Sequence, residues 1–122
     1  MTHILDATTG PAIINERPYI GDTWRGQIVN FRNDSGLIDV SADAFSLVLE
    51  DAAGTAILIL TLGDGIEFSG DGIIWEFTAA QTADFVKDAR WAYSLKWTKD
   101  SDGTVKTIIA GTVIPQRYTV NN

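Results

Sequence analysis

The sequence contains no cysteine, a single histidine and only three prolines in its 122 residues. Without cysteine the chain can form neither a disulfide framework nor a thiolate metal site. The one histidine, His3, lies in a polar N-terminal stretch where we expect no rigid surroundings to orient a catalytic base. These absences disfavour the common forms of nucleophilic and metal-dependent catalysis, and we expect no cofactor and no enzymatic activity.

Long apolar runs and an excess of positive charge are also missing. The longest apolar stretch, residues 56–62, has the length of a strand and falls short of the roughly 20 residues that a membrane helix needs. The N-terminus has neither the basic start nor the apolar core of a signal peptide. Sixteen acidic residues against nine basic ones give a formal net charge of −7, which repels nucleic acid and anionic membranes. We therefore expect neither of these as a partner.

The sequence does contain strong strand-like alternation. Apolar side chains occupy every second position of residues 73–77 and of residues 91–97, which is the period of a half-buried strand. Between them, residues 79–87 follow Thr78, a good N-cap, and carry alanines and a glutamine, so we predict one short helix there. Residues 99–103, Lys-Asp-Ser-Asp-Gly, predict a tight turn into a final strand.

Turn signals recur about every eight to twelve residues, which is typical of a β-sandwich of roughly seven short strands. We predict an all-β antiparallel sandwich over residues 17–114, a flexible or partner-docked arm over residues 1–16, and a tail over residues 115–122. Residues 13–20 are predicted to form an edge strand interrupted by Pro18. Because residues 56–62 are apolar on both faces, we expect the tail or another subunit to cover the second face.

Two groups of acidic residues are candidates for reactive sites. Glu67, Asp71 and Glu76 could supply the paired carboxylates of a hydrolase, although charged residues at such positions are mostly solvated. Residues 100–103, Asp-Ser-Asp-Gly, resemble the start of a calcium loop, but no glutamate follows at the distance that a bidentate ligand requires. A hairpin turn is the favoured interpretation of this segment, and we predict no metal site.

Aromatic and apolar residues supply the remaining candidates. Trp91, Tyr93 and Trp97 share one face of a strand and could stack on sugars in a glycan-binding module. Such a row of rings more often forms the core of a sandwich. A second set lies outside the predicted core yet is apolar, aromatic or basic, and is therefore predicted to dock on a partner. It comprises Ile4, Leu5, Ile13, Ile14, Tyr19, Arg117, Tyr118 and Val120.

Several short motifs follow one another in order over residues 17–113. They are Gly-Asp-Thr-Trp at 21–24, Phe-Ser-Leu-Val-Leu at 45–49, Thr-Ala-Ala-Gln-Thr-Ala at 78–83, Lys-Trp-Thr at 96–98, Asp-Gly-Thr at 102–104 and Gly-Thr-Val at 111–113. In this order they resemble the small immunoglobulin-like domains of tailed-phage virions, such as the N-terminal domain of baseplate upper proteins. The motifs form the fold, so the resemblance carries over no active site.

The resemblance implies an immunoglobulin-like fold and a structural role in a virion, at its head, neck, tail or baseplate. Such a protein is made in the host cytoplasm, contacts other virion proteins and can form an oligomer. No fibre or receptor-binding region follows Val113 in the sequence, which favours an assembly or adaptor module. The alternative function from the sequence is glycan binding through the aromatic row.

Overall fold

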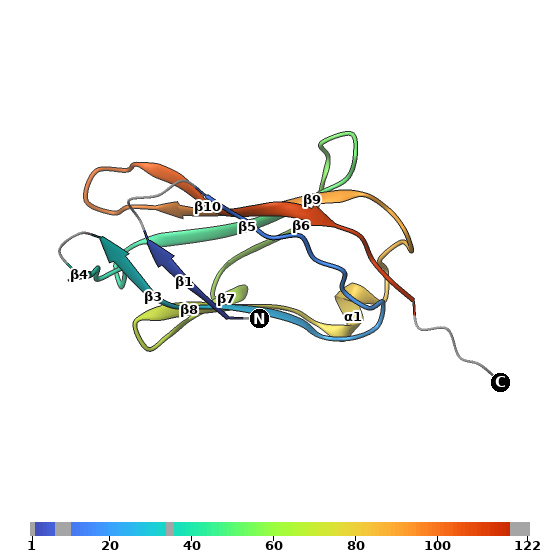
Figure 1. Cartoon of the computed structure of the whole chain (residues 1–122), viewed down its shortest axis with the longest axis horizontal. Coiled ribbons are helices and arrows are strands. Elements are labelled where there is room, and N and C mark those ends of the chain that lie inside the picture. The colour runs from blue at the N-terminus through green and yellow to red at the C-terminus, as the bar shows by residue number, and fades with distance from the viewer. Residues whose placement is uncertain (1, 7–10, 34–35, 118–122) are drawn as a thin grey trace.

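Strands make up most of the chain in the computed structural model, which describes residues 2–6, 11–33 and 36–117 (Figure 1). The expected all-β class is confirmed. Within the described residues, no helix is long and apolar enough to cross a membrane. The elements are β1 (Thr2–Asp6), β2 (Ala12–Ile13), β3 (Trp24–Asn33), β4 (Gly36–Leu37), β5 (Ala44–Glu50), β6 (Ala56–Leu62), β7 (Gly65–Ser69), β8 (Gly72–Phe77), α1 (Ala79–Thr82), β9 (Trp91–Thr98) and β10 (Val105–Val113).

The described strands form one curled, mixed sheet. Its order is β1-β3-β8-β7-β6-β5-β9-β10-β2, and β4 pairs with β3 at one side. The sheet folds over on itself, so that β3, β8 and β7 lie in one layer and β5, β9 and β10 in the other (Figure 1). Most neighbours are antiparallel, but β1–β3, β2–β10 and β6–β7 are parallel. The expectation of a wholly antiparallel arrangement was therefore wrong at these pairs.

The core lies between the two layers. Burial alternates strictly along β5 and β9, so that one face of each strand is enclosed, as the sequence period predicts. Aromatic rings line the core: within one layer Trp24 stacks on Phe77 with ring centroids 4.7 Å apart, and between the layers the ring of Phe31 lies 5.3 Å from those of both Phe45 and Trp97. Rings in such contact add about 0.5–1.5 kcal/mol beyond the area that they bury.

Residues 12–20, called the N-terminal edge segment below, run parallel to the end of β10. The N–H of Ile14 donates to the carbonyl of Ala110 at 2.9 Å, and the buried hydroxyl of Tyr93 donates to the carbonyl of Ile14 at 2.7 Å. Pro18 is buried within this segment. The position of the predicted edge strand at a sheet edge is confirmed, but its length is not: β2 covers only Ala12–Ile13, and isolated bridges at Glu16 and Tyr19 continue the pairing. This part of the expected arm is paired with the sheet of its own chain.

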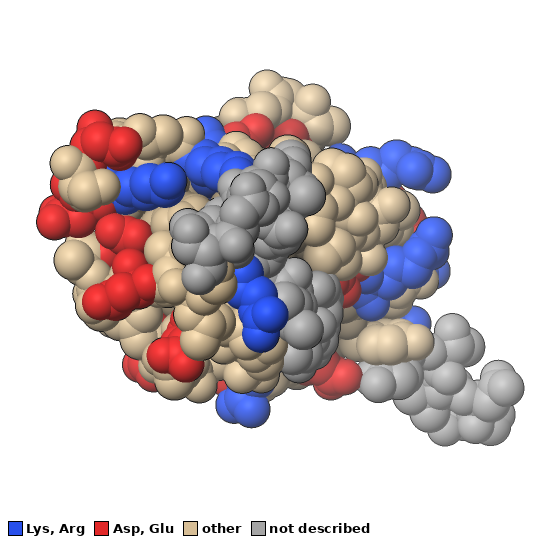
Figure 2. Space-filling view, turned by 60° about the vertical axis from the view of Figure 1, so that its left-hand side comes forward, with Lys and Arg blue, Asp and Glu red and all other residues tan. Residues whose placement is uncertain are grey.

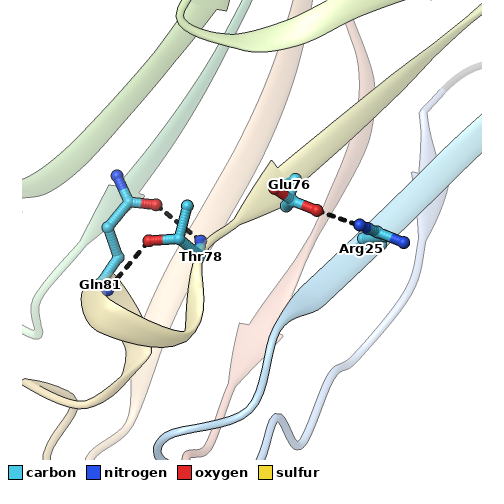
Figure 3. Close-up of polar contacts among 4 residues, drawn as sticks. All are labelled: Arg25, Glu76, Thr78 and Gln81. Atoms are coloured by element: carbon cyan, nitrogen blue, oxygen red, sulfur yellow. Dashed lines mark hydrogen bonds and ion pairs between the residues drawn. The ribbon is translucent and has the colours of Figure 1, made fainter.

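Helix α1 begins where the sequence predicts and ends earlier. Thr78 caps it with a capping box: its hydroxyl accepts the N–H of Gln81, and the Gln81 side chain accepts the N–H of Thr78 (Figure 3). After Thr82 the chain tightens, because the N–H of Asp84 reaches back only to the Gln81 carbonyl. The expected helix over residues 79–87 was therefore wrong in length, since this three-residue spacing ends an α-helix.

Charge is spread unevenly over the molecule. On the face drawn in Figure 2, acidic side chains gather at the left and basic side chains lie toward the middle and right. Both signs are therefore present on this face, although the chain as a whole carries a formal charge of −7.

Gly111 on β10 should tolerate no side chain. A Cβ atom at this position would lie 1.9 Å from the Ile14 carbonyl oxygen, and backbone cannot move aside as a flexible side chain can. We expect Gly111→Ala to lower the free energy of unfolding by about 1–3 kcal/mol, because it overpacks the contact with the N-terminal edge segment. Urea denaturation measures this loss.

Thr112→Ala is the matched control for that substitution. It alters the neighbouring residue but keeps the backbone N–H that donates to the Asn15 side chain. We expect it to stay within about 0.5 kcal/mol of the unmodified chain. Equal stability of the two variants would show that the edge segment does not depend on close contact with β10.

Candidate functional site

The aromatic row on β9 is part of the core. Trp91, Tyr93 and Trp97 are 8%, 3% and 0% exposed, respectively. The indole N–H of Trp97 donates to the carboxylate of Asp43 at 2.7 Å, which satisfies its polar atom inside the protein. Because a sugar can stack only on an exposed ring, the prediction of a glycan platform at these residues was wrong. The core interpretation of the row is confirmed.

Two of the three candidate carboxylates share a groove. Glu67 and Glu76 line a depression of about 700 Å³ on the outer faces of β3, β7 and β8, whereas Asp71 lies in the turn between β7 and β8 and is not part of the lining. Glu76 accepts a hydrogen bond from Arg25 Nε at 2.5 Å (Figure 3). Their side chains are 38% and 73% exposed. A pair this accessible is worth only about 0–1 kcal/mol and is typical of a solvated surface.

The loop that resembles a calcium site is a hairpin turn, as predicted. The N–H of Lys99 donates to the Thr104 carbonyl at 2.9 Å. The carboxylate of Asp102 accepts the N–H of Thr104 at 2.8 Å, and this backbone hydrogen bond lowers the pKa of Asp102. The N–H of Asp100 donates to Asp43. Over residues 2–6, 11–33 and 36–117, no group of three histidine, cysteine, aspartate or glutamate residues is placed to hold a metal.

The predicted docking residues differ in exposure. Ile13 is 69% exposed and Tyr19 is 42% exposed, both on the N-terminal edge segment. Ile14 is half-buried against the core, and Arg117 is exposed. The backbones of Ile4 and Leu5 belong to β1, but their side chains, like all of Tyr118 and Val120, lie outside the described residues. Ile13 and Tyr19 are therefore the members of this set that present apolar surface at a sheet edge.

Strand β6 presents a surface that the list of docking residues missed. Ile57 is 37% exposed and Ile59 is 53% exposed, whereas Leu60 between the layers is 1% exposed. Pairing with β7 uses only Thr61 and Leu62 of this strand. Residues 56–60, called the β6 edge below, thus have no strand on that side among the described residues. The sequence indicated this surface through residues 56–62, which are apolar on both faces of the strand. The described part of the chain covers only one of these faces.

A small cleft adjoins the β6 edge. It has a volume of about 310 Å³ and lies between the start of β6 and α1. Its lining consists of Ile57, Leu58, Ala80, Gln81, Asp84 and Phe85. This α1 cleft contains a carboxylate and no basic side chain among the described residues that line it. An aliphatic side chain with a cation nearby would suit such a lining.

Thr82 holds α1 in place beside this cleft. Its side chain is 0% exposed. Its hydroxyl accepts the N–H of Gly21 at 3.1 Å and donates to the carbonyl of Asp22 at 2.7 Å. Both partners belong to the turn that precedes β3, so one buried hydroxyl joins the helix to a distant loop. Buried polar groups with such partners stabilise one fixed arrangement.

One acid on the N-terminal edge segment is in unfavourable surroundings. A carboxylate oxygen of Glu16 is buried and has no hydrogen-bond partner among the described residues. This burial raises the pKa of Glu16 above its ordinary value of 4.5. Burial, with a smaller contribution from the charge of Glu16, also raises the pKa of Tyr93. The segment is therefore bound to the sheet in spite of a local electrostatic cost.

The chain was also compared with known proteins. No protein-family model matches it, and no curated protein matches it. The exposure, charge and hydrogen bonding of the β6 edge, the α1 cleft and the N-terminal edge segment are therefore the guide to what they bind.

Replacing Thr82 by valine should loosen the helix. Thr82→Val keeps the shape but removes the hydroxyl, which leaves the Gly21 N–H and the Asp22 carbonyl without this partner. We expect the free energy of unfolding to fall by about 1–3 kcal/mol, and Thr82→Ser, which keeps the hydroxyl, to lose less. Thermal unfolding followed by circular dichroism checks this order. If Thr82→Ser lost more stability than Thr82→Val, the methyl group of Thr82 and not its hydroxyl would be the group that holds α1 in place.

Replacing Glu16 by glutamine should stabilise the protein in a pH-dependent way. Because the folded-state pKa is raised, ionisation of Glu16 costs stability, and this cost develops as the pH rises from the ordinary value of 4.5 through the folded-state pKa. We expect Glu16→Gln to raise the melting temperature by a few degrees at pH 7 and to have no advantage below pH 4.5. Glu67→Gln, at an exposed position, serves as the control. An advantage of Glu16→Gln that did not change with pH would exclude ionisation as its cause.

Proposed function

We propose that this chain is a non-enzymatic assembly or adaptor module of a phage virion, and that it acts by protein contact. The observation that carries the proposal is the β6 edge. Ile57 and Ile59 are exposed there, and residues 56–60 pair with β5 on one side but with no described strand on the other. Exposed apolar edges attract further strands, and monomeric proteins usually protect them. A protein that joins others has a use for such an edge.

The fold that we propose for this role is an immunoglobulin-like sandwich. One half of the sheet runs β1-β3-β8-β7 and the other runs β6-β5-β9-β10-β2. In chain order these halves match strands A, B, E and D of a variable-type domain and the opposing sheet built around C, F and G with C′. Two features depart from that plan: β6 joins β7, which makes the two halves one continuous sheet, and β1 runs parallel to β3 instead of antiparallel.

Further support comes from the N-terminal edge and from the sequence. Ile13 and Tyr19 add exposed apolar and aromatic surface at the β2 end of the strand order. The ordered motifs over residues 17–113 resemble virion domains, which is the reason for proposing a virion instead of another assembly. The partners are then other virion structural proteins, or further copies of this chain, and assembly follows synthesis in the host cytoplasm.

Association with particles tests this function. Phage particles are purified by density-gradient centrifugation from cells in which the complete phage genome encodes the chain, and its copy number per particle is measured by quantitative mass spectrometry. We expect a fixed copy number that survives repeated gradients. Recovery of the chain only from the soluble fraction, with particles of normal composition, would overturn the proposal.

A further inference from the structure

We propose that the β6 edge binds an extended segment of a partner protein as an added strand, and that this segment is apolar at alternate positions and flanked by basic residues. The inference rests on the proposed assembly role, for which it names the contact surface and the chemistry of the partner. Three observations support it: the backbone of residues 56–60 has no strand on the side of β7 among the described residues, Ile57 and Ile59 are exposed, and acidic residues lie around them.

The backbone of the β6 edge has hydrogen-bonding groups on its open side. In a strand paired on one side, alternate N–H and C=O groups point outward and need partners. Proteins commonly protect such edges with lysine, proline or a bulge. Residues 56–60 read Ala-Ile-Leu-Ile-Leu and contain no proline and no charge. The register with β5 shifts between Leu58 and Ala56, which places an irregularity at Ile57, so the regular part of the edge is residues 58–60. This part is suited to accept another strand.

The side chains supply the second argument. Ile57 and Ile59 lie on the outer face of the sheet, where alternate residues of an added strand would cover them. Next to them, the α1 cleft of about 310 Å³ is lined by Leu58, Ala80 and Phe85 and offers room for an aliphatic side chain. A strand with apolar residues at alternate positions would fit this surface, since pockets for alternate side chains give strand addition its specificity.

Charge selects the kind of partner. Asp84 lines the α1 cleft, Glu50 lies opposite Ala56 at the start of β6, and Asp64 follows the end of the strand. All three are acidic, in a chain with a formal charge of −7. Basic residues at both ends of the added segment would be attracted, whereas a second copy of this chain would bring like charges together. We therefore favour a basic-flanked segment of another protein over self-association.

Peptide binding to the full chain tests the inference. The probe is the blocked peptide Lys-Thr-Val-Thr-Val-Thr-Lys; one control carries Glu in place of both lysines, and another carries Pro in place of the central threonine. We expect the Lys peptide to shift the backbone amide NMR signals of residues 56–60 and of α1. The Glu peptide should bind at least ~10-fold more weakly at low salt, with a smaller difference at high salt, because screening weakens exposed charges. The Pro peptide, which cannot complete the ladder, should bind poorly.

Matched variants locate the contact. Ile59→Thr and Val105→Thr both remove aliphatic surface from β-branched residues, 53% and 58% exposed respectively, but Val105 lies on β10. We expect only Ile59→Thr to weaken binding of the Lys peptide, by roughly 3- to 10-fold. Asp84→Asn should reduce the preference for Lys over Glu flanks, whereas Asp71→Asn, in the β7–β8 turn, should preserve it.

Any of three results with the peptides would overturn the inference. They are no binding of the Lys peptide at millimolar concentration, equal binding of all three peptides, and signal shifts confined to other strands. Concentration-dependent shifts of residues 56–60 in the protein alone, with a dimer in light scattering, would also overturn it by making a second copy the occupant. Each result leaves the particle-association experiment unaffected, so the function can stand when this contact fails.

Discussion

The corner between β6 and β7 determines how the rest of the sheet is shaped. The chain makes a tight loop there within residues 61–66, with the N–H of Gly63 donating to the carbonyl of Ile66 at 2.9 Å, and β7 continues parallel to β6. Gly65 has a φ of +96°, and a Cβ atom there would lie 2.5 Å from the Leu60 side chain, so the corner needs glycine at this position. Because β7 leaves β6 after two paired residues and enters the other layer, the sheet can enclose a core, and the earlier part of β6 is left open.

The edge of the sheet at β10 is covered by another segment of the chain, whereas the β6 edge is not. The N-terminal edge segment completes β10 through backbone hydrogen bonds and through the hydroxyl of Tyr93, and it tolerates the buried carboxylate of Glu16. No comparable segment of the described chain lies along the β6 edge. The chain thus covers the edge at β10 even at an electrostatic cost, but it leaves the β6 edge uncovered. This difference is a reason to propose the β6 edge as the place where a partner binds.

Local patterns in the sequence predicted much of this fold. The alternation of Trp91, Tyr93 and Trp97 gave their shared face, and the residues around Thr78 gave the start of α1, because each is set by near neighbours. The parallel pairing of Ile14 with β10 depends on contacts between the two ends of the chain, which no local period encodes. The β6 edge was visible only as an apolar run, since its exposure depends on where β7 departs.

The pairing of the N-terminal edge segment with β10 also affects the order of folding. During synthesis from the N-terminus, residues 12–20 leave the ribosome long before β10, their hydrogen-bonding partner, has been made. Closing this edge is therefore a late and non-local step, which is slow because the intervening chain must first be ordered. The partners of β6, by contrast, are β5 and β7, its immediate neighbours along the chain. The β6 edge can thus form before β2 pairs with β10 at the far end of the same half of the sheet.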